Sequence, residues 1–317
     1  MKKSDLKKVA LIGTGFVGMS FAYALLNSGE CDQLVLIDIN KVKAHGESMD
    51  LNHGLPFAKR NMLIYDGEYS DCCDADIVVI AAGVNQKDGE SRIELLNRNY
   101  EVFKSIITPV VDSGFEGIFL VATNPVDIMT KITLDLSGFE SSRVIGSGTT
   151  LDTARLRYLL GDYFKIDPRN VHAYVIGEHG DSELIPWSQA YITTKNIYDI
   201  IDSSKGLYKF EDLYKISKNV TNAAQEIIRA KNATYYGIGM ALVRIVRAIF
   251  GDEKSALTVS VFLNGQYGVN GIYAGLPTII GRNGVEDIIV LDLKENERAA
   301  FLSSCKFLEE SAKCIKH

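Results

Sequence analysis

The sequence lacks a cysteine framework and a basic patch. Its five cysteines are odd in number, two are adjacent, and none forms a C-x-x-C pair. A disulfide framework or a metal site is therefore not expected, and the pattern favours a reducing compartment. The net charge is −6, and no cluster of Lys and Arg is interleaved with aromatic residues. Nucleic acid is not an expected partner.

The sequence also lacks a segment that is both long and apolar enough to cross a bilayer. The nearest candidate is the uncharged run 9–26, which follows four lysines and contains an Ala-Tyr-Ala sequence typical of signal-peptidase sites. Gly13, Gly15 and Gly18 interrupt this run, and a strand pattern follows it at 34–37. Both a signal peptide and a spanning helix are disfavoured. We expect a soluble, cytoplasmic protein with no membrane partner.

What is present points to an α/β protein. With 317 residues and 46% hydrophobic content, the chain can bury one large core or two moderate ones. In the first half, near-continuous apolar runs, typical of strands buried on both faces, alternate with helical patterns such as 93–111. This alternation predicts a doubly wound parallel sheet with right-handed crossovers. The expected strands are 9–12, 34–37, 77–82, 118–122 and 144–145.

The second half has a different pattern, typical of an α+β domain. Helical patterns cover 152–163, 213–230, 235–250 and 295–316. Extended stretches separated by turn residues cover 257–262, 272–280 and 288–291, which predicts antiparallel strands. The sequence shows no internal repeat and no low-complexity tract. We expect two domains, residues 1–147 and 148–317.

The first predicted strand runs into a glycine motif, G-x-G-x-x-G, and then into a helix. Gly13 permits a tight turn, Gly15 lets the backbone approach a pyrophosphate, and Gly18 lets the helix pack on the strand. The helix N-terminus then offers free N–H groups and a positive dipole to the phosphates. The motif alone is weak evidence, but its position between a strand and a helix predicts a Rossmann-type dinucleotide site in residues 1–147.

Asp38 ends the next predicted strand, twenty residues after Gly18. Its carboxylate can accept hydrogen bonds from both ribose hydroxyls, whereas a 2′-phosphate would meet its negative charge. No arginine follows directly to offset that charge, so the sequence favours NAD over NADP. The alternative is that Asp38 only caps the end of its strand.

A second motif, Ile-Gly-Glu-His-Gly-Asp-Ser-Glu at 176–183, presents His179 between two glycines. Gly177 and Gly180 indicate a backbone that bends to expose the imidazole, after a predicted strand at 171–176. A generic exposed loop histidine is the alternative. Two other features of the sequence, around Asp152 and Asn124, favour instead a histidine that transfers a proton.

Asp152 and Arg155 lie three residues apart at the start of a predicted helix, and they therefore share one face. They could simply form an intrahelical ion pair. In the functional interpretation they have separate roles. Arg155 clamps a substrate carboxylate with two hydrogen bonds, and Asp152 accepts a proton from one ring nitrogen of His179.

Asn124 follows the predicted strand 118–122, at the edge of the sheet where ligands of such folds bind. It can donate a hydrogen bond to a reacting oxygen, although an Asn-Pro turn is the plain alternative. Together with His179, Asp152 and Arg155, it fits hydride transfer between NAD and a small 2-hydroxy acid. Arg92, at the end of the loop 83–92, would polarise the carbonyl when that loop closes.

With these motifs the sequence resembles the L-lactate and malate dehydrogenases, most closely the bacterial L-lactate dehydrogenases. The resemblance covers roughly residues 6–315 and includes the glycine motif, V-A-T-N-P-V-D, L-D-T-A-R and G-E-H-G-D-S-E in the family's order. It implies the catalytic and substrate roles argued above and adds Thr234 near the substrate. It also implies a homotetramer. The cofactor contacts that it implies, in addition to Gly13, Gly15, Gly18 and Asp38, are Val17, Lys43, Tyr69, Gly83, Val84, Ser105, Ala122, Asn124, Ser147 and Ile238.

The resemblance further implies an allosteric site. Arg157 lies about 200° around the helix from Arg155 and so faces away from the active site. In family members that fructose 1,6-bisphosphate activates, an arginine and a histidine at the positions of Arg157 and His172 bind the sugar phosphates across a subunit interface. An interface arginine and a solvated histidine without this role are the alternative.

Gln86 decides between substrates. The resemblance implies that malate dehydrogenases place an arginine at this position, where it pairs with the second carboxylate of their substrate. Gln86 is neutral, so the sequence favours pyruvate and L-lactate, with malate dehydrogenase and a catalytically silent NAD-binding protein as the alternatives. Asp88 replaces a proline that is frequent in relatives, which removes a restraint on φ in the same loop.

Overall fold

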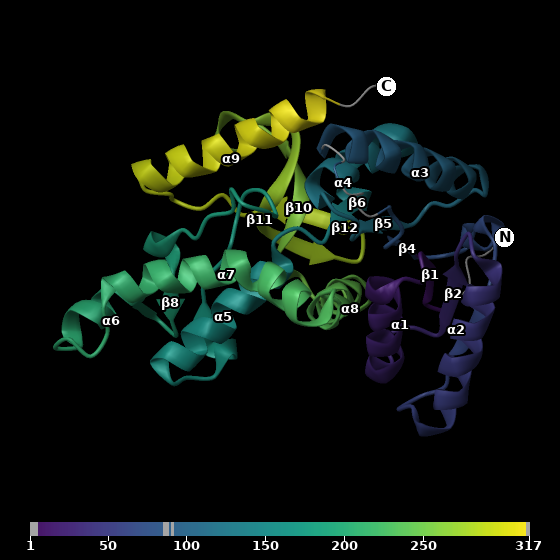
Figure 1. The fold of residues 1–317 in the computed structure, drawn as a ribbon, viewed down its shortest axis with the longest axis horizontal. Coiled ribbons are helices and arrows are strands. Elements are labelled where there is room, and N and C mark those ends of the chain that lie inside the picture. The colour runs from purple at the N-terminus through teal and green to yellow at the C-terminus, as the bar shows by residue number, and fades with distance from the viewer. Residues whose placement is uncertain (1–5, 85–88, 90–91, 315–317) are drawn as a thin grey trace.

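A computed structural model describes residues 6–84, 89 and 92–314 of the chain. Within these residues, one nine-stranded sheet runs through the molecule in the order β12-β11-β10-β6-β5-β4-β1-β2-β3. Figure 1 shows helices on both faces of this sheet, as expected of a doubly wound fold. A second sheet of three short strands, β7-β8-β9, lies beside the helices of the second half.

The parallel part of the sheet confirms the prediction from the apolar runs. Its strands pair in parallel from β3 at one edge to β6, and most of their residues are buried. One strand, β3, was not predicted, because it is a short edge strand with an alternating burial pattern and only three apolar residues. The strands are β1 (Lys8–Ile12), β2 (Gln33–Ile37), β3 (Leu63–Asp66), β4 (Ile77–Ile80), β5 (Ile118–Val121) and β6 (Val144–Gly146).

Four helices of the first half connect these strands. Their ends follow local signals: the side chain of Asn40 accepts a hydrogen bond from the backbone N–H of Lys43 at the start of α2, and α1 ends at Gly29 with φ of 71°. The helices are α1 (Phe16–Ser28), α2 (Lys41–Gly54), α3 (Arg92–Asp112) and α4 (Val126–Ser137).

The antiparallel strands of the second half join the same sheet, which the sequence did not predict. β10 pairs with β6, with Ser260 opposite Gly146, and so continues the parallel sheet in antiparallel sense. The pairing joins segments more than a hundred residues apart, and no local pattern reports it. The strands are β10 (Ser255–Asn264), β11 (Asn270–Gly281) and β12 (Gly284–Ile288), so the predicted strand 288–291 overlaps β12 only at its last residue.

The remaining elements form the second half of the molecule. α8 packs against α1, α5 against α7, and α9 against β11. The predicted strand 171–176 is shortened to β7, and α6 was not predicted. The helices are α5 (Thr150–Phe164), α6 (Ile197–Ser203), α7 (Phe210–Lys231), α8 (Tyr236–Phe250) and α9 (Glu295–Lys313), and the short strands are β7 (Val171–His172), β8 (Tyr191–Ile192) and β9 (Lys195–Asn196). Short 3-10 helices lie at Leu55–Phe57, Tyr69–Cys72, Ser141–Arg143, Pro168–Asn170, Trp187–Gln189 and Gln266–Gly268.

Two apolar cores hold these layers together. The larger one surrounds the nine-stranded sheet, and the smaller one, which includes Leu156, Val171 and Val220, joins α5 and α7 to β7. No helix within the described ranges combines the length and the hydrophobicity that a bilayer crossing needs.

The glycine motif depends on two close backbone approaches. Gly13 has φ of 100°, and a Cβ there would lie 2.6 Å from the backbone nitrogen of Ala82. A Cβ at Gly18 would lie 2.0 Å from the carbonyl oxygen of Gly13. The packing of α1 on β1 therefore requires glycine at both positions, as the motif predicts.

We expect Gly18→Ala to destabilise the fold, because the added methyl group collides with rigid backbone. The loss in free energy of unfolding is expected to be about 2–3 kcal/mol, the upper range for overpacked cores. Scanning calorimetry then shows a lower apparent melting temperature. Gly15→Ala is the matched control, because no atom lies within 4 Å of the position of its Cβ and φ there is −76°. Equal losses in the two variants would contradict this account.

Candidate active site

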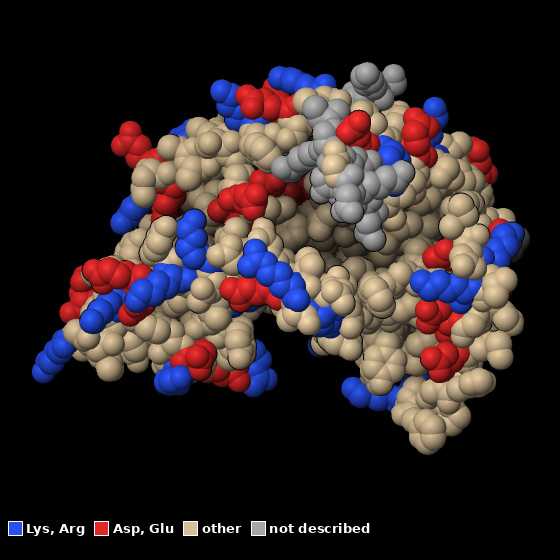
Figure 2. All heavy atoms as spheres, in the orientation of Figure 1, with Lys and Arg blue, Asp and Glu red and all other residues tan. Residues whose placement is uncertain are grey.

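The predicted site residues gather at the carboxyl edge of the parallel strands. Gly83, Ala122, Asn124 and Ser147 follow β4, β5 and β6 closely in the chain, and this is the edge where ligands of such sheets bind. Figure 2 shows that this face of the molecule is hollowed in the middle, over the place of β5, β6 and β10 in Figure 1. On the same face Lys and Arg are interspersed with Asp and Glu.

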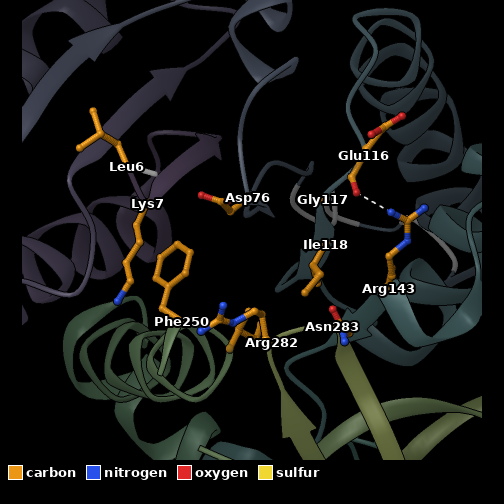
Figure 3. A pocket seen from close by; sticks show the side chains of 11 residues that line it. Leu6, Lys7, Asp76, Glu116, Gly117, Ile118, Arg143, Phe250, Arg282 and Asn283 are labelled. Carbon is orange, nitrogen blue, oxygen red and sulfur yellow. Dashed lines mark hydrogen bonds between the residues drawn. The ribbon is translucent and has the colours of Figure 1, made fainter. Parts of the chain in front are cut away.

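A cavity of about 510 Å³ lies at the opposite edge of the sheet (Figure 3). Its lining includes Asp76, directly before β4, Ile118, the first residue of β5, and Arg143, directly before β6. These positions mark the amino ends of the strands. The cavity is therefore separate from the candidate active site.

The glycine motif leaves room for a dinucleotide. No atom lies within 4 Å of the place where a Cβ of Gly15 would be, and Gly15 is the N-cap of α1. The first turn of α1 holds no acidic residue, and no side chain caps it. Its N–H groups and positive dipole are thus available to a pyrophosphate, so the residues present fit NAD.

Asp38 makes more contacts than the sequence predicted. One carboxylate oxygen accepts hydrogen bonds from the backbone N–H and the hydroxyl of Thr14, at 2.7 and 2.8 Å, and the other accepts from the N–H of Asn40 at 2.9 Å. Although partial burial opposes the charge, these hydrogen bonds hold the pKa of Asp38 below its ordinary value. Asp38 therefore fixes the glycine loop and also presents a negative charge at the end of β2.

The structure places the other predicted cofactor contacts on several elements. Val84 follows β4, and its N–H donates to the side-chain oxygen of Asn99 at 2.9 Å. Asn99 is buried on α3, and its side-chain nitrogen has no hydrogen-bond partner in the part of the chain that the structure describes. The sequence analysis missed Asn99, whose only signal is a polar residue on the buried side of a helical pattern. The remaining positions are Val17 on α1, Lys43 on α2, Tyr69 after β3, Ser105 on α3 and Ile238 on α8.

The structure brings His179, Asp152 and Arg155 into direct contact. His179 Nδ1 lies 2.6 Å from Asp152 Oδ2, and Arg155 Nη1 donates to Asp152 Oδ1 at 2.7 Å. The intrahelical ion pair is therefore present, and the same carboxylate also contacts the imidazole of His179. The side chain of Asp152 is 3% exposed and that of His179 is 24% exposed, so the imidazole is the part that a ligand reaches.

Buried threonines position this group. Thr149 Oγ1 donates to the carbonyl of Val175 at 2.6 Å, and the N–H of Val175 donates to Thr153 Oγ1 at 2.9 Å. They hold the start of α5 against the segment that leads to His179. Gly177 has φ of 91°, which confirms the expected bend before the imidazole.

A buried aspartate that the sequence analysis missed fixes the backbone of His179. The N–H of His179 donates to Asp127 Oδ2 at 2.9 Å, and the hydroxyl of Ser260 on β10 donates to the other oxygen. Burial raises the pKa of Asp127 to about 6. Its signal was present in Asn124-Pro-Val-Asp127, three residues after the predicted Asn124. The contact also places the exposed Asn124 close to residues 177–183, the segment that carries His179 (the His179 loop).

Electrostatics favour a charged imidazole. Although burial opposes the charge, the Asp152 carboxylate raises the pKa of His179 to about 9. Burial likewise opposes ionisation of Asp152, but His179 and Arg155 hold its pKa below the ordinary value. His179 Nε2 is the ring nitrogen not engaged by Asp152. The arrangement can hold a proton there and exchange it with an oxygen of a ligand.

Arg157 faces away from this site, as the helix geometry predicts. Its Nε donates to the carbonyl of Ala173 at 3.1 Å, and its guanidinium lies over the ring of Tyr174 at 5.1 Å. Burial lowers its pKa from the ordinary value of arginine. His172 precedes Ala173 and is exposed on β7, next in the chain to the segment that Arg157 contacts.

Three predicted positions are less defined. Gln86 lies outside the described residues, and Arg92 is described only as the first residue of α3. Thr234 lies half-buried between α7 and α8.

Fold and site together define a Rossmann-type enzyme that binds a nicotinamide dinucleotide and holds a buried, hydrogen-bonded His–Asp pair beside that site. Comparison with known proteins agrees. Residues 7–146 match the family model for the NAD-binding domain of lactate/malate dehydrogenases. Residues 149–317 match the model for the alpha/beta C-terminal domain of the same family. The chain belongs to the lactate/malate dehydrogenase family and is an NAD-dependent oxidoreductase.

Similar proteins cover nearly the whole chain. L-lactate dehydrogenase 2 of Bacillus cereus is 52% identical over 309 residues, which are 98% of each chain. An L-lactate dehydrogenase of a Geobacillus species is 54% identical over 310 residues, covering 98% of this chain and 97% of its own. Among solved structures, a lactate dehydrogenase from a deep-sea metagenome library has a TM-score of 0.96 at 53% identity, covering 98% of both chains. The ligand-bound minor L-lactate dehydrogenase of Enterococcus mundtii has a TM-score of 0.97 at 44% identity, covering 99% of both chains.

We expect Asp152→Asn to destabilise the protein in a pH-dependent way. The folded pKa of His179 is raised to about 9, so the pair stabilises the fold fully below the unfolded pKa of about 6.5 and loses this contribution as pH rises through 9. The variant should unfold with about 3 kcal/mol less free energy near pH 6, and the difference from wild type should shrink above pH 9. Denaturant unfolding at both pH values measures it. A difference that does not change with pH would refute the raised pKa.

Proposed function

We propose that the protein is an L-lactate dehydrogenase that interconverts L-lactate and pyruvate. The observation that carries this proposal is the 2.6 Å contact between His179 Nδ1 and Asp152 Oδ2, with Arg155 bonded to the same carboxylate. This contact supplies a proton carrier and a carboxylate-binding cation side by side. The curated relatives that match the chain over nearly its full length are named L-lactate dehydrogenases.

NAD, when bound, supplies the acceptor or donor of the hydride. His179 Nε2 gives a proton to the carbonyl oxygen of pyruvate during reduction and accepts it from the hydroxyl of L-lactate during oxidation. Asp152 holds the other ring nitrogen in place and stabilises the imidazolium. Because the pKa of His179 is about 9, its imidazole is protonated in the free enzyme at neutral pH and can give a proton to pyruvate. Lactate oxidation needs the neutral imidazole and is therefore favoured at higher pH.

Arg155 binds the substrate carboxylate. One of its N–H groups donates to Asp152, and the rest of the guanidinium has no hydrogen-bond partner among the residues described, so it can form the two-pronged contact. In this proposal Asn124 and Thr234 contact the substrate, and Arg92 polarises its carbonyl when the loop closes. Residues 1–147 bind NAD through the contacts predicted from the sequence, and residues 148–317 supply the catalytic groups.

Gln86 is proposed to select pyruvate over oxaloacetate. An amide cannot neutralise a second substrate carboxylate, and an unpaired carboxylate in a closed site is strongly disfavoured. Malate dehydrogenase remains the second candidate only because the family models that match cover both enzymes.

Regulation by fructose 1,6-bisphosphate is part of the proposal. The support is the contact of Arg157 with the carbonyl of Ala173, the residue directly after the exposed His172. The guanidinium and the imidazole suit the two phosphates of this sugar. The proposal takes the protein to be a cytoplasmic homotetramer in which paired subunits share this site.

The assay that tests the function follows NADH oxidation at 340 nm with pyruvate or oxaloacetate, each with and without fructose 1,6-bisphosphate. We expect pyruvate to be preferred and the sugar bisphosphate to lower its KM without a large change in kcat. Faster turnover of oxaloacetate would overturn the substrate assignment. Identical pyruvate saturation curves with and without the effector would overturn the regulation alone.

Gln86→Arg is predicted to shift preference towards oxaloacetate. The introduced guanidinium pairs with the second carboxylate, so the ratio of kcat/KM for oxaloacetate over pyruvate should rise about a hundredfold or more, the effect of about 3 kcal/mol. Gln86→Glu is the control of opposite charge and should depress oxaloacetate further. A ratio unchanged by the arginine would remove the physical basis of the assignment.

A further inference from the structure

The active site contains a third carboxyl group, Glu183, that the reaction described above does not use. One of its carboxylate oxygens lies, together with a ring nitrogen of His179 and an oxygen of Asp152, in a set of atoms that are all within 4.8 Å of one another. Its Oε1 accepts a hydrogen bond from the hydroxyl of Thr221 on α7 at 2.9 Å. Two elements, the His179 loop and α7, therefore hold this carboxyl against the proton-transfer pair.

The hydrogen bonding leaves room for a proton on Glu183. The Thr221 hydroxyl has a single hydrogen, and the carbonyl of Ser217 lies at 3.3 Å as a competing acceptor. The other carboxyl oxygen, Oε2, has no hydrogen-bond donor within the described ranges. Among the described residues a single donor, which has a competing acceptor, thus supports a negative charge at this position, whereas a carboxylate that is kept ionised commonly accepts two or three hydrogen bonds.

The charge balance of the site points the same way. The groups that face Glu183 are Asp152 and Arg155 from α5, His179 from its own loop and Thr221 from α7, and Asp127 lies behind His179. A bound substrate adds one further carboxylate to a cluster that already holds Asp152 and Asp127. An ionised Glu183 would therefore add a negative charge beside the place where the anionic substrate binds, whereas a protonated Glu183 would not.

We propose that Glu183 must carry a proton for the anionic substrate to bind, so that the free enzyme captures pyruvate with two protons in place, one on His179 and one on Glu183. This inference rests on the proposed function and concerns the same site. Burial and the Asp152 carboxylate raise the pKa of Glu183 to about 8, which is consistent with it. Glu183 is then a positioning residue, since it sets the charge that the substrate meets.

The pH dependence of pyruvate capture reports how many protons the free enzyme must hold. The limiting slope of log(kcat/KM) against pH counts the protons that the free enzyme must hold to capture its substrate. Both required protons are lost as pH rises, that of Glu183 near 8 and that of His179 near 9. Above these values the slope for pyruvate should approach −2.

The experiment compares wild type with Glu183→Gln between about pH 7 and pH 10.5. We expect a limiting slope of −2 for wild type and −1 for Glu183→Gln, which imitates the protonated carboxyl at every pH. The ratio of kcat/KM in the variant to that in wild type should therefore be about tenfold or more higher at about pH 10 than at neutral pH. Glu183→Asp keeps a carboxyl and should keep the slope of −2.

Glu226→Gln is the matched control for the charge change, because Glu226 is exposed on α7, the helix that carries Thr221. It should follow the wild-type profile. Parallel alkaline slopes for wild type and Glu183→Gln, whether both −1 or both −2, would overturn the inference.

A second measurement covers a variant that turns over poorly. The dissociation constant of oxamate, an unreactive isostere of pyruvate, is measured with the NADH complex over the same pH range and should show the same difference in slope. Circular dichroism melting establishes that each variant is folded. Failure of the proposed function appears differently, as a wild type that neither reduces pyruvate nor binds oxamate at neutral pH.

Discussion

The charge of Asp152 is the constraint on which the active site depends. Its buried carboxylate is shared between the ring of His179 and the guanidinium of Arg155, at 2.6 and 2.7 Å. A carboxylate that is 3% exposed is unfavourable without such partners. In the proposed reaction the two groups that stabilise this charge also bind a 2-keto acid, His179 at its carbonyl oxygen and Arg155 at its carboxylate. Stability of the helix start and competence of the site therefore come from the same interaction.

The fold brings this group to the cofactor by extending one sheet across both halves of the chain. β10 pairs with β6 and supplies Ser260, whose hydroxyl donates to Asp127. Asp127 lies in the first turn of α4, the helix that follows β5, and it accepts a hydrogen bond from the N–H of His179. The His179 loop is thereby fixed to the edge of the sheet that carries the glycine motif and Asp38, where NAD binds. The carboxyl groups of Asp127, Asp152 and Glu183 outnumber the cations of His179 and Arg155 in this cluster. In our proposal a proton on Glu183 therefore lowers the negative charge that an anionic substrate meets.

The strongest sequence signals were local ones. The apolar runs of β1, β2, β4 and β5 predicted the parallel sheet because strands buried on both faces need few polar residues. The glycine motif was predictable because Gly13 and Gly18 make backbone contacts that only glycine allows. The spacing of Asp152 and Arg155 showed that they share a helix face, but it could not show that one carboxylate serves both the ion pair and His179.

The features that were missed depend on contacts between distant segments. The pairing of β10 with β6 and the role of Asp127 leave no periodic pattern in the sequence. Glu183 belongs to the same motif as His179, yet only the position of Thr221 on α7 shows that it faces the site. The edge strand β3 was too short and too exposed to stand out.

Asp152 keeps His179 charged at neutral pH, on the geometry of their contact. Nitrogen-15 NMR of the histidine side chains at about pH 7.5 measures this charge, with the His179 signals assigned by their loss in His179→Gln. We expect both ring nitrogens of His179 to be protonated and the proton on Nδ1, facing Asp152, to be strongly deshielded. A neutral ring with a single protonated nitrogen at that pH would contradict it.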